Sequence, residues 1–123
     1  MLELKYFKIS EFDSPDLPNS GVNMDSEFLD KVDRIRGLCG FPFKINSGYR
    51  TIEHNAKVKG EIDSAHLRGL ACDIKCTTSY ERFEIVSNSL KCGIKRIGIY
   101  RNFVHLDDDK SLPNRVMFIG KNL

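Results

Sequence analysis

Two short stretches of the chain contain residues that can bind a metal ion. In SAHLRGLACDIKC, His66 and Asp73 are separated by six residues that include Gly69 and Ala71, and in FVHLDDD, His105 precedes a run of acids. Two imidazole nitrogens and one carboxylate oxygen, with a fourth position left to water, form the open tetrahedral arrangement of a catalytic zinc site. The spacing alone is common by chance, so a hydrogen-bonded strand histidine and a salt-bridged aspartate remain the alternative.

A metal site here requires that the two stretches lie on neighbouring strands. Residues 70–76 predict a strand, in which successive side chains point to opposite faces. Asp73 then points to one face, and Cys72 and Cys76 point to the other. His66 lies in the loop that leads into this strand. We therefore expect both cysteines in the core and not at a metal.

Two helices are predicted to flank this strand. Apolar residues at helical spacing predict a helix that begins at Asp25 or Ser26 and ends at Gly40. A second helix is predicted over residues 78–93, because a threonine and a glutamate three positions later form a capping box. Its expected apolar stripe consists of Phe83, Val86 and Leu90.

Short strands are predicted within FKINSGYR, RIGIY, FVHLD and RVMFIG, and YRNF is typical of a tight hairpin turn. Residues 12–25 are rich in turn-forming residues and predict a surface loop. The expected fold class is α+β, with two main helices packed on a small, mostly antiparallel sheet that carries the zinc site. We expect residues 1–123 to form a single domain and a monomer.

Composition excludes several classes of protein. The net charge is +2 without a dense basic run, so nucleic acid is not an expected partner. No apolar run approaches the roughly 20 residues of a membrane span, and no signal peptide is visible, so we expect synthesis in the cytoplasm. Because no secretion signal is visible, the four cysteines are expected to be reduced thiols and not disulfides. They also lack the close CxxC pairs of a thiolate zinc site.

Several motifs occur in a fixed order: INSGYRT, EHNAKVKG, SAHLRGLACDI and RIGIYRNFVHLD. Together they resemble the zinc D-alanyl-D-alanine peptidase family, whose signature S-x-H-x-x-G-x-A-x-D is followed downstream by a strand ending H-x-D. Every fixed position of the first motif is filled, by Ser64, His66, Gly69, Ala71 and Asp73. The opening YFKISEFDSPDLP and the overall shortness resemble the phage and prophage branch.

The resemblance implies zinc as the cofactor and His66, Asp73 and His105 as its ligands. It also implies that Arg50 binds a substrate carboxylate or the developing oxyanion, for which a planar guanidinium is suited. A surface salt bridge is the alternative for Arg50. Ser64 is expected to bind substrate or orient the ligand loop, and a turn-forming role is its alternative.

The general base is less well defined. Several relatives carry an acid three residues before the last histidine ligand, where this chain has Asn102. Asp107 is the nearest substitute, because it lies two positions after His105 and residues two apart on a strand point to the same face. A partner that only orients His105 is an equal alternative for Asp107. Acids of less suitable position are Asp109, Asp63 and Glu53.

The expected function is hydrolysis of peptidoglycan stem or cross-link peptides at or near D-alanine, after release or delivery of the protein to the cell wall. The sequence does not distinguish a carboxypeptidase from an endopeptidase. The alternatives are an inactive zinc-binding module, which Asn102 favours, and a structural virion component of the same fold.

Overall fold

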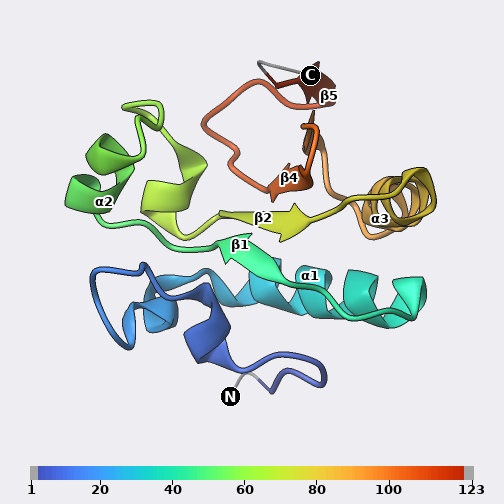
Figure 1. Ribbon diagram of the computed structural model, residues 1–123, viewed down its shortest axis with the longest axis horizontal. Helices are drawn as coiled ribbons and strands as arrows, with labels where there is room; N and C mark the ends of the chain where they lie inside the picture. Colours follow the sequence, from blue (N-terminus) through green and yellow to red (C-terminus); the bar gives the residue numbers. More distant parts are fainter. Residues whose placement is uncertain (1–2, 121–123) are drawn as a thin grey trace.

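A computed structural model describes residues 3–120 of the chain. Its elements are η1 (Ile9–Phe12), η2 (Ser20–Asn23), α1 (Ser26–Cys39), β1 (Ile45–Ser47), α2 (Ile52–Lys57), η3 (Ala65–Arg68), β2 (Ala71–Lys75), α3 (Ser79–Lys91), β3 (Arg96–Ile99), β4 (Phe103–Asp107) and β5 (Val116–Ile119). In Figure 1, α1 runs below the sheet, while α2 and α3 lie at opposite ends of β2. The predicted α+β class is confirmed.

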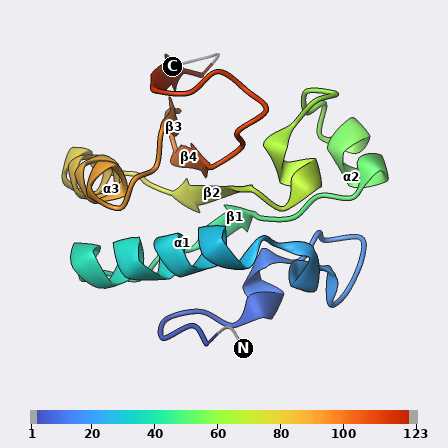
Figure 2. The same ribbon diagram turned by 180° about the vertical axis from the view of Figure 1, so that it is seen from behind.

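The five strands form one sheet in the order β1-β2-β4-β3-β5. All neighbouring pairs are antiparallel except β3 and β5, which run parallel. The turn between β3 and β4 is the tight hairpin that YRNF predicts, closed by a hydrogen bond from Tyr100 N to Phe103 O. Seen from behind in Figure 2, this hairpin rises from the centre of the sheet above β2.

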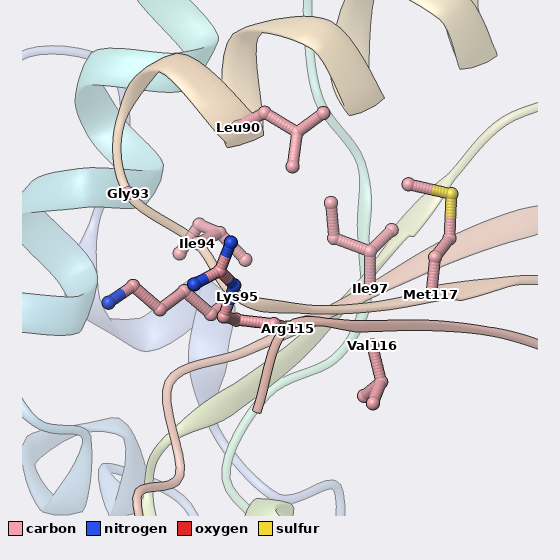
Figure 3. A pocket seen from close by; sticks show the side chains of 8 residues that line it. All are labelled: Leu90, Gly93, Ile94, Lys95, Ile97, Arg115, Val116 and Met117. Atoms are coloured by element: carbon pink, nitrogen blue, oxygen red, sulfur yellow. The ribbon is translucent and has the colours of Figure 1, made fainter. Parts of the chain in front are cut away.

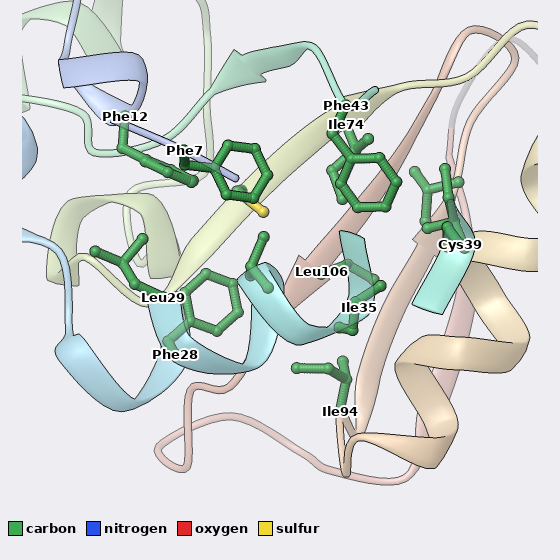
Figure 4. Close-up of a cluster of buried hydrophobic side chains, with 14 of the residues drawn as sticks. Phe7, Phe12, Phe28, Leu29, Ile35, Cys39, Phe43, Ile74, Ile94 and Leu106 are labelled. Carbon is green, nitrogen blue, oxygen red and sulfur yellow. The ribbon is translucent and has the colours of Figure 1, made fainter. Parts of the chain in front are cut away.

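Helix α1 follows the prediction closely. Asp25 caps its start by accepting a hydrogen bond from Phe28 N, and Gly40 ends it with a left-handed backbone at φ 75°. Its buried face packs with residues of the sheet in a single apolar cluster, part of which Figure 4 shows. Cys72 and Cys76 belong to that cluster and are fully buried, so the strand alternation is confirmed on this side of β2.

The apolar stripe predicted for α3 is wrong at two of its three positions, because only Val86 among them packs against the core. Phe83 and Leu90 are 68% and 55% exposed, and the helix buries Ile85, Asn88 and Ser89 instead. The hydroxyl of Ser89 donates a hydrogen bond to Ile85 O. The side-chain amide of Asn88 donates one to the sulfur of Cys39 at the end of α1. These buried polar groups are satisfied within or between the helices, so α3 packs on α1 through a face that hydrophobicity alone does not reveal.

Residues 12–25 form less of a surface loop than predicted. The side chain of Phe12 is fully buried, and Ser14 and Ser20 are also buried.

Within residues 3–120, no helix is both long and apolar enough to cross a membrane.

Candidate metal centre

The face of the sheet opposite α1 carries a row of residues in register. Asp73 on β2 lies opposite His105 on β4, and His105 lies opposite Gly98 on β3. His66 reaches the same place from η3, which immediately precedes β2. Ser64 starts η3 by accepting a hydrogen bond from His66 N at 3.2 Å, and Gly69 ends it with a left-handed backbone at φ 70°. Two sequence-distant stretches therefore meet at one point.

The two histidines converge on one carboxylate oxygen. His66 Nε2 lies 3.3 Å from Asp73 Oδ1, and His105 Nδ1 lies 2.9 Å from the same atom. One ligand atom from each of the three residues lies within 4.8 Å of the others. Zinc bonds of about 2.0–2.2 Å place tetrahedral ligand atoms about 3.3–3.5 Å apart, so this donor set fits a zinc ion.

The outer nitrogens of both rings have their own partners. His66 Nδ1 lies 2.8 Å from Gly48 O, and a carbonyl can only accept, so this nitrogen carries the proton and Nε2 faces Asp73. His105 Nε2 lies 2.7 Å from Asp107 Oδ2. Such outer hydrogen bonds fix the ring orientation and tautomer of metal-binding histidines. Each ring therefore directs one unprotonated nitrogen toward Asp73 when it is neutral.

The charges at the centre are strongly coupled. Burial favours the neutral form of Asp73, yet the adjacent His66 and His105 hold the pKa of this carboxyl well below its usual range. Burial also opposes the charge on His105, but the carboxylates of Asp107 and Asp73 raise the pKa of its ring to about 9. A cation is thus favoured between these residues, whether it is a proton or a metal ion.

Asp107 is buried behind His105, with 1% of its surface exposed. While Oδ2 contacts His105, Oδ1 accepts hydrogen bonds from Arg96 Nε at 2.8 Å and from the backbone N–H of Asp109 at 3.2 Å. Arg96 lies directly opposite Asp107 in the pairing of β3 with β4. Both carboxylate oxygens of Asp107 are therefore engaged within the protein.

Arg50 lies on the other side of Asp73. Its Nη2 is 3.4 Å from Asp73 Oδ2, its Nε donates to Ser47 Oγ, and its Nη1 donates to Asn55 Oδ1. Burial lowers the pKa of its guanidinium, and Asp73 opposes that shift. A guanidinium has five N–H donors. These three contacts therefore leave other N–H groups of Arg50 that can bind a carboxylate.

These residues share one cavity of about 790 Å³. Its walls include His66, Asp73 and His105, the predicted site residues Arg50, Ser64 and Asp107, and the aromatic residues Tyr100, Phe103 and Phe118. The sequence predictions thus name six residues that line a single cavity. Asn102 and Glu53 are not among its lining residues.

A second cavity, of about 410 Å³, lies between the end of α3 and strands β3 and β5. Figure 3 shows its walls, which consist mainly of apolar side chains such as Leu90, Ile97 and Met117. Among residues 3–120, the only charged residues that line it are Lys95 and Arg115. It offers neither a metal-binding group nor an acid.

Comparison with known families decides the relationship. A family model of peptidase M15 matches residues 5–107. The chain belongs to the peptidase M15 family. The match runs from the N-terminal segment to the end of β4, and therefore contains the whole His66, Asp73 and His105 cluster.

Peptidases of the M15 family are metallopeptidases and in general depend on zinc, which agrees with the donor set of the cluster. The family resemblance that the motifs indicate is therefore confirmed at the level of the family. No relative of the chain is found among curated proteins.

Sequence reasoning missed two residues that hold this M15 site together. Arg96 could have been found by extending the YRNF hairpin, since counting back along both strands pairs it with Asp107. Asn55 bridges Arg50 and the loop carbonyl of Glu61. Its role depends on how a loop folds back, and no local pattern in the sequence reveals that.

Proposed function

We propose that the chain is a zinc-dependent peptidase that hydrolyses peptidoglycan stem or cross-link peptides at or near D-alanine. The observation that carries this proposal is the convergence of His66, Asp73 and His105 in one cavity of a peptidase M15 chain. We further propose that it belongs to the short phage or prophage branch and acts on the cell wall after release or delivery.

Each ligand has a defined task in this proposal. His66 and His105 would hold the metal through Nε2 and Nδ1, and Asp73 through Oδ1, since these atoms face one another. A bound zinc ion supplies a water of lowered pKa and polarises the scissile carbonyl. Asp73 Oδ2 stays with Arg50, so the guanidinium both orients the ligand and offers its remaining donors to a substrate carboxylate.

The role of Asp107 separates into two hypotheses. As a general base it would take a proton from the attacking water, and as a positioning residue it would hold His105 with Nδ1 toward the metal. Its burial and its contacts with His105 and Arg96 support the positioning role. Glu61 lines the same cavity, and its carboxylate forms no hydrogen bond or ion pair within residues 3–120, so it is the alternative base.

A catalytically inactive zinc-binding module is the second candidate function. Asn102 favours it, because an amide cannot accept the proton of the water at the position where several relatives carry an acid. Under this alternative, the zinc ion stabilises the fold and the cavity binds peptides without cleaving them.

Digestion of purified peptidoglycan tests the proposal. The zinc-loaded protein is expected to release free D-alanine or new amino groups, identified by mass spectrometry of the products, and a chelator is expected to stop the release. His66→Ala should be inactive, whereas His54→Ala, which changes a histidine outside the cavity lining, should be as active as the wild type. Zinc binding without any product would favour the inactive module.

A further inference from the structure

The hairpin between β3 and β4 places a tyrosine beside the metal centre. Tyr100 follows β3 and pairs with Phe103 through the hydrogen bond from Tyr100 N to Phe103 O. Arg82 of α3 secures the turn by donating from Nη2 to Arg101 O at 2.9 Å. By strand alternation Phe103 shares the face of His105, and both aromatic residues line the metal cavity.

The ring of Tyr100 is fixed on several sides. It stacks on Phe103 with ring centroids 4.2 Å apart and an angle of 11° between the planes. A Cβ atom at Gly120 would lie 2.0 Å from the ring, and one at Gly98 would lie 3.0 Å from it. Glycine at position 120 therefore leaves the space that the ring occupies, and this side chain is held in place before any substrate arrives.

The hydroxyl group of Tyr100 has no hydrogen-bond partner within residues 3–120, and its ring is only half-buried. Burial raises the pKa of this phenol, as do the negative charges of Asp73 and Glu61, while Arg50 opposes them. Tyr100 therefore keeps its proton at neutral pH and remains a hydrogen-bond donor. A rigid side chain with an unused donor at a metal cavity is suited to a developing negative charge.

We propose that Tyr100 donates a hydrogen bond from its hydroxyl to the oxygen of the scissile carbonyl as that oxygen gains negative charge. This inference rests on the proposed peptidase function. The donor is fixed in advance by Phe103 and Gly120, so no reorganisation is needed when the tetrahedral intermediate forms. Arg50 then serves the substrate carboxylate, and Tyr100 serves the carbonyl oxygen.

The test compares Tyr100→Phe with the wild type in zinc-loaded form. The variant keeps the stacked ring and removes only the hydroxyl. Loss of one such donor is expected to lower kcat on a peptide ending in D-alanyl-D-alanine about 10²-fold with little change in KM. The affinity for a phosphinate analogue of that dipeptide, a tetrahedral mimic, should fall by a similar factor. Zinc affinity measured by calorimetry should not change.

Tyr80→Phe is the matched control, because Tyr80 is an exposed residue of α3 that does not line the cavity. It should leave kcat, phosphinate affinity and zinc affinity unchanged. If the wild type cleaves no peptide but Tyr100→Phe still weakens phosphinate binding, the peptidase proposal fails, and only the placement of the Tyr100 hydroxyl at an oxygen of the tetrahedral ligand stands. Three results would overturn the assignment. Tyr100→Phe could show unchanged kcat and phosphinate affinity, Tyr100→Phe could show a lower zinc affinity, or the wild type could fail to bind the phosphinate.

Discussion

His105 Nε2 lies 2.7 Å from Asp107 Oδ2, on the side of the ring opposite to the nitrogen that faces Asp73. This contact sets which nitrogen of His105 is free for a metal ion. It also engages the carboxylate of Asp107, which is the acid closest to His105 in the sequence. The same pair of residues therefore links the geometry of the metal centre to the identity of the base.

Asp107→Asn separates the two roles of this carboxylate. If Asp107 orients His105, zinc affinity is expected to fall about 10- to 100-fold, because an amide supports the ring less well. Zinc affinity is measured by competition with a chromophoric chelator, and the cobalt-substituted protein should show an altered visible spectrum. Asp108→Asn is the control, since Asp108 pairs with Lys31 and not with the metal centre.

A general base behaves differently. Asp107→Asn with normal zinc affinity, a normal cobalt spectrum and a large loss of kcat would contradict the positioning role. In that case Glu61→Gln should remain active. If Asp107 is a positioning residue and Glu61 is the base, Glu61→Gln should lose activity and retain zinc.

Arg50→Lys is expected to damage both stability and substrate binding. A single ammonium cannot reach Ser47, Asn55 and Asp73 together, as the guanidinium does through three nitrogens. We expect a loss of about 1–3 kcal/mol in the free energy of unfolding and a KM about 10-fold higher. Arg34→Lys, at an exposed position, should change neither. Wild-type stability and KM in Arg50→Lys would refute this role.

The metal-free protein should lose stability in alkaline solution. The folded-state pKa of His105, about 9, exceeds the unfolded value of roughly 6.5. The protonated ring therefore stabilises the fold fully below about pH 6.5, and this contribution is lost as the pH rises through about 9. The Tm of the wild type should fall between pH 6 and pH 10. The same fall is expected for His54→Gln but not for His105→Gln. Parallel curves for the wild type and His105→Gln would contradict this.

The cysteines of β2 should be dispensable for metal binding. Cys72 and Cys76 are fully buried on the α1 side of the sheet, away from Asp73. Cys72→Ala and Cys76→Ala are each expected to bind one zinc ion per chain with wild-type affinity, while stability falls by about 1 kcal/mol or more. Thiol labelling of the native wild type should modify the half-buried Cys92 before either of them. Loss of zinc from either variant in its folded state would overturn the placement.

Alternation along a strand was enough to predict the two faces of β2. Asp73 and Cys72 differ by one position, so a single assignment of the strand separates a residue of the candidate metal centre from a core residue. The α1 boundaries were equally accessible, because Asp25 and Gly40 act through local hydrogen bonds and backbone conformation. Local rules of this kind need no knowledge of the partner elements.

The face of α3 could not be predicted in the same way. Hydrophobicity selected Phe83 and Leu90, but the helix buries Asn88 and Ser89, whose polar groups are satisfied by Cys39 and by the helix itself. Which face is buried depends on the shape of α1, which lies far away in the sequence. For the same reason the bridge from Arg50 through Asn55 to the loop of Glu61 is visible only in the folded chain.

A zinc titration of the metal-free protein tests the central claim most directly. Release of amino groups from purified peptidoglycan is followed as zinc is added in known amounts. The account predicts that activity rises linearly and reaches its limit at one zinc ion per chain, and that Asp73→Ala shows neither binding nor activity. Absence of hydrolysis at any zinc content, or equal hydrolysis by the metal-free protein, would contradict it.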